Sequence, residues 1–250
     1  MSARTAARTF SSRLCLAVSA VSALLGCSDD DDGGGAPGTV VVVAYGEDFV
    51  ESGIAADAMG DGWAIDFERF ELWARDITFD RSRSSEPGPV DLTEPSGGAG
   101  HELVSLEVPP GDYTAPAFTL SRLEVQGRAT REGVTKTFAW SFESPIRYTR
   151  CETTLTVPSG GAVTFQITVH ADHLFYDSLV SEEPRLLFGP LALADADDDG
   201  TLTRAELEAT DIGALDPGNA DIDELWTWLS AQASTLGHVD GEGHCVSAPE

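Results

Sequence analysis

The feature that most constrains the fold of this chain is a series of short runs in which apolar and polar residues alternate. The clearest run is 163–170, in which Val, Phe, Ile and Val at the odd positions alternate with Thr, Gln, Thr and His at the even positions. A period of two places the apolar side chains on one face of a β-strand, whereas a helix requires a period of 3.6. This run therefore predicts a strand with one buried face.

Comparable runs recur from residue 39 to about residue 175, and Gly and Pro clusters separate them. They lie at residues 39–45, 63–72, 77–79, 103–108, 117–125, 134–142 and 146–157. The apolar phase changes between Phe67 and Phe70, which predicts a β-bulge near residues 68–69. About eight short strands with turn signals between them favour an antiparallel β-sandwich over residues 39–180.

The pattern changes to short helical segments in residues 181–250. Residues 186–194 predict a turn of helix that starts at Pro190, and residues 204–209 predict a second short helix. Residues 221–236 predict a longer amphipathic helix, with Gly237 as its C-terminal cap. We therefore expect a mainly β-protein with a small helical segment after the sandwich.

An acidic loop lies within the helical segment. Residues 195–206 read Asp-Ala-Asp-Asp-Asp-Gly-Thr-Leu-Thr-Arg-Ala-Glu. Three carboxylates on alternate residues can converge on one point, and Gly200 permits the sharp turn that brings them together. The spacing resembles the twelve-residue calcium loop of the EF-hand family. The resemblance implies that Ca²⁺ is bound by Asp195, Asp197, Asp199, Thr201, Thr203 and Glu206.

An alternative interpretation of this loop needs no metal. Thr203 and Glu206 have the spacing of a capping box, which starts a helix by itself. A capping box does not account for the three alternating acids, which repel one another unless a cation lies among them. EF-hands usually occur in pairs, and the sequence contains no second calcium loop. A structural calcium site is therefore favoured over a calcium sensor.

The N-terminus has the pattern of an export signal. Three Arg residues precede an apolar run, 14–25, which is too short to span a bilayer comfortably. The run ends in Leu-Leu-Gly-Cys27, which resembles a bacterial lipobox and implies removal of residues 1–26 and lipidation of Cys27. An ordinary secretory signal with an incidental Cys is the alternative. Residues 27–38 then form an acidic, Gly-rich tether, and we expect location in the cell envelope, at the outer membrane or cell surface.

The charge of the chain excludes some partners. The formal net charge is −27 at pH 7, and loss of the signal segment removes three Arg residues without removing an acid. A chain this acidic is repelled by nucleic acid and by anionic lipid. We therefore expect it to contact the membrane through the lipid anchor. The sequence carries no motif that identifies a protein or glycan partner.

The cysteines and histidines suggest how the β-sandwich and the helical segment are joined. Cys151 and Cys245 are the two cysteines that remain after export and lipidation, so we expect a disulfide between them. We also expect a hairpin of residues 155–157 with 163–165, which would place Cys151 opposite Val169. The disulfide would then gather four side chains that could bind copper or zinc: His170, His173, His238 and His244. In the alternative, His170 only continues a polar strand face, and the tail is a pinned loop.

The features taken together indicate a binding or structural protein. The chain combines a lipobox, an acidic tether, a β-domain, a calcium loop and a His-containing tail. In this combination it resembles uncharacterised bacterial lipoproteins, and that resemblance implies no activity. No Gly-x-Ser-x-Gly elbow, phosphate loop or His-Glu-x-x-His helix is present, so we expect no enzyme. The sequence predicts a lipid-anchored, extracytoplasmic calcium-binding protein with a structural or adhesive role. The alternative is a periplasmic protein that binds or delivers copper or zinc.

Overall fold

The computed structural model describes residues 35–250. The predicted signal segment, 1–26, and the predicted lipidation site at Cys27 lie outside the described residues. Within the described range the chain is mainly β-structure with few, short helices, which confirms the predicted fold class. No helix in this range is long and apolar enough to cross a membrane.

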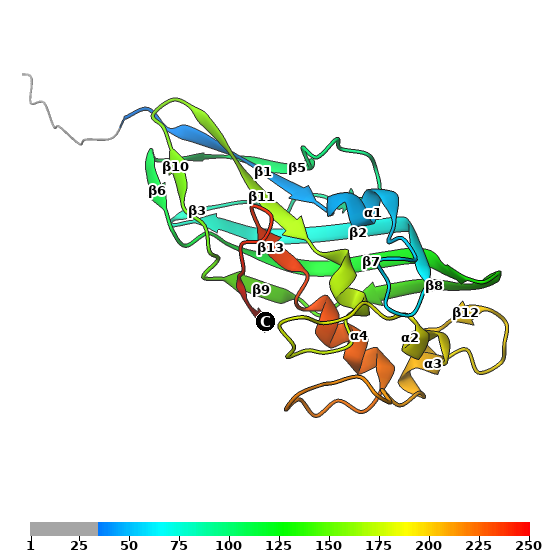
Figure 1. Ribbon diagram of the computed structural model, residues 1–250. Helices are drawn as coiled ribbons and strands as arrows, with labels where there is room; N and C mark the ends of the chain where they lie inside the picture. The colour runs from blue at the N-terminus through cyan, green and yellow to red at the C-terminus, as the bar shows by residue number, and fades with distance from the viewer. Residues whose placement is uncertain (1–34) are drawn as a thin grey trace, which may run out of the picture. The chain divides into compact units, whose positions relative to one another are not determined.

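Two larger sheets account for most of the strands (Figure 1). The first sheet has the order β13 (Gly237–Val239), β11 (Ala162–Val169), β1 (Gly38–Tyr45) and β5 (His101–Val108). The second has the order β12 (Thr201–Leu202), β8 (Val134–Phe142), β7 (Ala117–Arg131), β2 (Ala64–Phe79) and β3 (Ser82–Arg83). Short strands β4 (Val90–Asp91), β9 (Ile146–Thr149) and β14 (Val246–Pro249) extend it by pairing β4 with β2 and β9 with both β7 and β14. A two-stranded sheet pairs β10 (Leu155–Val157) with β6 (Gly111–Tyr113).

The helices are short and lie mostly in the C-terminal part. They are α1 (Glu47–Ser52), the 3₁₀-helix η1 (Ala171–Phe175), α2 (Gly189–Ala192), α3 (Arg204–Glu208) and α4 (Leu225–Ala233). Pro190 occupies the first turn of α2, as its lack of a backbone N–H favours. The predicted helix over 221–236 is shorter than expected at both ends. The Glu224 side chain accepts hydrogen bonds from Trp226 N and Thr227 N and so caps the helix at Leu225. The helix ends at Ala233 with Ser234 as its C-cap, and Gly237, the predicted cap, is instead the first residue of β13.

The buried faces of the two larger sheets contribute to one hydrophobic core. Val42 and Phe165 come from the first sheet, and Phe70 and Phe79 come from the second; all four are fully buried. The Phe79 and Phe165 rings meet edge to face with 5.1 Å between their centroids. The pairing of β2 with β7 shifts register between Phe67 and Arg69, which confirms the predicted bulge.

Three features of the sheets differ from the sequence-based expectations. The first is that β1 and β11 pair in parallel, although most other pairings are antiparallel. The second is the predicted hairpin of 155–157 with 163–165, which is wrong because β10 pairs with β6 and β11 pairs with β1 and β13. The third is that the C-terminal tail is not a loop, since β13 and β14 each add a strand to a sheet. Local alternation reveals a strand but not its partner, because pairing is set by packing across the core.

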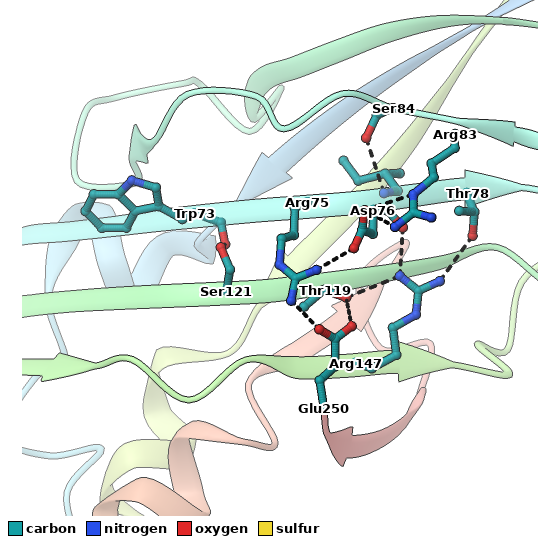
Figure 2. A network of polar contacts seen from close by, with 11 residues as sticks. Trp73, Arg75, Asp76, Thr78, Arg83, Ser84, Thr119, Ser121, Arg147 and Glu250 are labelled. Atoms are coloured by element: carbon teal, nitrogen blue, oxygen red, sulfur yellow. Dashed lines mark hydrogen bonds and ion pairs between the residues drawn. The ribbon is translucent and has the colours of Figure 1, made fainter.

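The chain end is held on the second sheet by a polar network (Figure 2). Arg75 pairs with both Asp76 and Glu250, and Thr119 donates a hydrogen bond to Glu250 Oε1 at 2.8 Å. Arg147 donates to the backbone carbonyl of Asp76 at 2.7 Å. Glu250 is thus joined to β2 by Arg75 and to β7 by Thr119, so β14 is fixed by side chains as well as by its ladder to β9.

Candidate metal sites

The acidic loop lies between α2 and β12. One carboxylate oxygen from each of Asp195, Asp197 and Asp199 lies within 4.8 Å of the others. Backbone N–H groups hold the loop in this curl: Gly200 N donates to Asp195 Oδ2 at 3.0 Å, and Thr201 N donates to Asp199 Oδ1 at 2.7 Å. Gly200 has a φ of +85°, a conformation that favours glycine. The three acids therefore converge as the spacing predicted.

Asp195 is the buried member of this group. Its side chain is fully inaccessible, and its Oδ1 has no hydrogen-bond partner within the described part of the chain. Its Oδ2 forms an ion pair with Lys136 of β8, which is the only lysine in the sequence. The hydrogen bond from Lys136 holds the pKa of Asp195 below its usual value. An ammonium group thus lies beside the carboxylate that occupies the first position of the loop.

Glu206 closes the loop from the first turn of α3. Its Oε2 accepts hydrogen bonds from Thr203 N at 2.9 Å and Thr203 Oγ1 at 2.7 Å, and Glu206 N donates to Thr203 Oγ1 in return. The capping box is therefore present. Glu206 Oε1 accepts from Ala196 N at 3.1 Å, so the carboxylate also reaches back to the start of the loop. The hydrogen bonds from Thr203 lower the pKa of Glu206.

The loop is anchored on the edge of the second sheet. Leu202 is buried and pairs with Phe138 in a parallel bridge between β12 and β8. Thr137 N donates to the Gly200 carbonyl at 2.7 Å. β8 therefore supports this part of the loop. The sequence reasoning missed this contact, since it joins segments that lie far apart in the chain.

The four predicted histidines come together. The ring centroids are 4.2 Å apart for His170 and His238, 5.3 Å for His173 and each of these two, and 4.9 Å for His238 and His244. His101 is elsewhere, in β5, where its Nε2 contacts the Glu94 carbonyl. We call His170, Asp172, His173, His238 and His244 the histidine cluster.

Strand pairing, and not the predicted hairpin, brings these rings together. In the β11–β13 ladder Thr168 is opposite His238, and His170 N donates to the Leu236 carbonyl at 3.0 Å. His173 follows in η1, one turn beyond His170. The disulfide between Cys151 and Cys245 positions His244, since Glu152 N donates to the His244 carbonyl at 2.8 Å. The predicted disulfide therefore helps to place one of the four rings.

The rings of His170 and His173 each have polar neighbours. His170 Nδ1 lies 3.4 Å from Glu47 Oε2, and its Nε2 lies 3.2 Å from the Gly241 carbonyl. His173 Nδ1 lies 2.9 Å from Thr235 Oγ1. Glu47 follows β1 with a left-handed backbone, φ +58°, which is uncommon for Glu. No sequence signal pointed to Glu47, because only the fold brings the end of β1 to the end of β11.

Two buried polar atoms of the cluster have no partner among the described residues: Asp172 Oδ1 and His238 Nδ1. Both residues are more than nine-tenths buried, at 8% and 6% exposure. The other oxygen of Asp172 accepts a hydrogen bond from the Tyr176 hydroxyl at 2.9 Å. Buried polar atoms without partners are rare in folded proteins, so these two indicate an incomplete set of interactions.

Burial keeps the inner histidines uncharged. Burial, together with the neighbouring imidazoles, lowers the pKa of His173 to about 4 and that of His238 to about 3. Burial also raises the pKa of Glu47, although His170 opposes that shift. Near pH 7, His173 and His238 therefore keep a ring nitrogen with a free lone pair.

The cluster borders a cavity of about 630 Å³. Glu47, Tyr176 and Glu242 contribute to its wall beside the histidines. One oxygen of Glu47, one of Glu242 and one nitrogen of His170 lie within 4.8 Å of one another. The cavity gives solutes access to a group of N and O donors.

Comparison with known proteins finds no matching family model, no matching curated protein and no matching solved structure.

Proposed function

We infer that this chain is a calcium-binding protein of the bacterial cell envelope in which the ion has a structural role. The observation that carries the proposal is the fully buried Asp195, whose Oδ1 has no partner in the described structure although Asp197 and Asp199 converge beside it. A hard divalent cation satisfies such a group, since Ca²⁺ prefers six to eight oxygen ligands. The envelope location rests on the lipobox-like sequence ending at Cys27.

The ligands would come from the loop itself. Asp195, Asp197 and Asp199 supply carboxylates, and the Thr201 carbonyl and Thr203 complete the loop side. Glu206 is the closing ligand, because its carboxylate already reaches the Ala196 N–H at the start of the loop. On binding, the Glu206 carboxylate exchanges its hydrogen bonds with Thr203 for contact with the ion. The ammonium group of Lys136 must then move away from Asp195.

A bound ion would stabilise the junction between the helical segment and the second sheet. The loop leads directly into β12, which pairs with β8, and then into α3. An ion that fixes the loop therefore favours both the pairing of β12 with β8 and the position of α3. Extracellular calcium modules bind with Kd of about 10⁻⁴–10⁻³ M, and we expect affinity near this range. A single site supported by a strand suits a structural role.

The test is thermal unfolding of a soluble form that begins at Ser28, which retains every described residue. Calcium in hundredfold excess over Kd should stabilise the folded state by about 2.7 kcal/mol and raise Tm relative to EDTA. Glu206→Gln should lose most of this shift, because it removes the charged, bidentate ligand.

The matched control is Glu208→Gln, which changes an exposed acid on the same helix that pairs with Arg204. This variant should keep the calcium-dependent rise in Tm. Equal melting temperatures in calcium and in EDTA for the parent protein would contradict the proposal.

A further inference from the structure

The histidine cluster is a second set of metal-ligand groups, made by different residues from those of the calcium loop. Its donors are mainly imidazole nitrogens, whereas the loop offers only oxygens. Imidazole favours Zn²⁺ and Cu²⁺, and carboxylate and carbonyl oxygens favour Ca²⁺ and Mg²⁺. The two sites therefore differ in the metals they would select.

The unpartnered atoms point to a ligand at this position. His238 Nδ1 and Asp172 Oδ1 are both buried and both lack a hydrogen-bond partner within residues 35–250. His238 comes from β13, and Asp172 comes from η1 at the end of β11. The His238 ring centroid lies 4.2 Å from that of His170 and 5.3 Å from that of His173, so His238 belongs to the same group of side chains as Asp172.

The spacing of the donors suits a small coordination sphere. One donor atom each from His170, Asp172 and His173 lies within 4.8 Å of the others. Tetrahedral zinc with bonds of about 2.0–2.1 Å holds its ligand atoms roughly 3.3 Å apart. Side-chain rotations that move each donor atom by roughly an ångström bring the donors to this separation. The adjoining cavity gives the ion a path of entry.

The outer contacts of the rings have the arrangement seen around metal-bound histidines. Such a histidine usually uses its second nitrogen to bond a carboxylate, carbonyl or hydroxyl, which fixes the ring. His173 Nδ1 contacts Thr235 Oγ1, which leaves Nε2 for a metal. His170 Nε2 contacts the Gly241 carbonyl, which leaves Nδ1 on the side of Glu47.

We propose that the histidine cluster binds one divalent transition-metal ion, Zn²⁺ or Cu²⁺, through His170, Asp172, His173 and His238. Glu47 lies beside His170 Nδ1, the nitrogen that faces the ion, and is an additional acidic ligand. His244 is exposed at the rim, where it can take up an incoming ion. The site joins the end of β11 to the C-terminal tail.

The direct test is metal titration of the same soluble form, with Zn²⁺ and Cu²⁺ in separate experiments and Ca²⁺ present throughout. We expect one tightly held ion per chain. Nitrogen hyperfine splitting in the electron paramagnetic resonance spectrum of the Cu²⁺ complex would identify imidazole ligands. Intense visible absorption of a Co²⁺ complex would show that the site is tetrahedral. Competition between Zn²⁺ and Cu²⁺ then shows which ion is preferred.

Three variants locate the ion. His173→Ala should weaken binding at least tenfold and change the Cu²⁺ spectrum, whereas His101→Ala should leave both unchanged, because His101 lies outside the cluster. His244→Ala, at an exposed position, tests the rim without disturbing the core, and it should slow metal uptake.

Folding of each variant is checked by its calcium-dependent Tm shift, which belongs to the other site and should persist. If His173→Ala fails to fold, Glu47→Gln replaces it, with weaker binding expected. Absence of stoichiometric binding would overturn the proposal, as would binding that His101→Ala abolishes and the cluster variants do not alter. Neither result would affect the calcium proposal.

Discussion

At the residue scale, Lys136 is the side chain with the most specific consequence. It is the only lysine of the chain, and it lies on β8 with its ammonium group against the buried Asp195. In the sequence it interrupts the apolar face of a predicted strand. The structure explains the interruption, because an otherwise unpaired buried carboxylate is strongly destabilising.

Lys136 therefore substitutes for part of the charge of a metal ion. We predict that Lys136→Met lowers Tm in EDTA, because Asp195 loses its counter-charge, and enlarges the rise in Tm on adding calcium. The dissociation constant for calcium should fall several-fold, since the ion no longer competes with an ammonium group. Calorimetric titration measures this change directly.

The control for this prediction is Arg128→Met, which removes an exposed cation that pairs with Asp66 and Glu68. Its calcium affinity should stay close to that of the parent protein. Weaker calcium binding in Lys136→Met would show that the ammonium group supports the site and does not compete for it.

At the element scale, the last strand depends on charged side chains. Among the described strands β14 pairs with β9 alone, and the Glu250 carboxylate is held by Arg75 and Thr119 (Figure 2). The hydrogen bond from Arg83 lowers the pKa of Asp76, and the hydrogen bond from Thr119 lowers that of Glu250. Ordinary values are 3.8 and 4.5 respectively, so in the unfolded chain both groups take up protons at a higher pH than in the folded protein.

This difference gives a pH dependence with a definite sign. The network should contribute its full stability above about pH 5 and lose it as the pH falls through 4.5 and 3.8 toward the lowered values. Asp76→Asn should lower Tm at pH 7 and have less effect at pH 3. Asn suits the left-handed backbone at this position, φ +54°, so the variant changes charge with little added strain.

Thermal melts of the parent and the variant across pH 3–7 measure this difference. Asp57→Asn, at an exposed loop position, serves as the control and should change Tm little at any pH. A Tm deficit in Asp76→Asn that stays constant down to pH 3 would show that charge pairing is not the source of the stability.

At the scale of the whole molecule, long-range links join the C-terminal segment to the sheets. The Cys151–Cys245 disulfide spans 94 residues and encloses the acidic loop, the helices η1, α2, α3 and α4, and β13. β12 and β13 each add to a different sheet. The segment after residue 180 is therefore integrated with the sandwich.

We predict that the double variant Cys151→Ser/Cys245→Ser is markedly less stable. The chain-entropy estimate for a loop of this length is about 4–5 kcal/mol, and real bridges often contribute less. Urea unfolding of the parent and the variant, both in calcium, measures the loss. Coincident unfolding midpoints would show that the bridge does not stabilise the fold.

The proposed envelope anchor belongs to the same scale. Cys27→Ala should abolish incorporation of a palmitate analogue in cells, because the modified thiol is removed. The disulfide variant should label normally and so serves as the control. Equal incorporation in wild type and Cys27→Ala would contradict the lipidation assignment.

The sequence by itself determined where the longer strands lie, where β2 is bulged and how the loop 195–206 curls. It did not reveal the short strands of the C-terminal tail, β13 and β14. The features that it determined are local matters: alternation with period two, a phase change at Phe67–Phe70, and carboxylates at alternate positions before a glycine. It also indicated the pairing of Cys151 with Cys245, because the predicted export and lipidation of Cys27 would leave only these two cysteines free to pair. Such features depend on neighbours within about a dozen residues or on simple counting.

Only the tertiary structure decided which strands pair and what surrounds each site. The parallel pairing of β1 with β11, the support of Leu202 by Phe138 and the approach of Glu47 to His170 each join distant segments. The histidines were predicted to meet by way of a hairpin that does not form, yet the β11–β13 ladder brings them together. Partner choice depends on how two apolar faces fill a common core, and no local pattern encodes that.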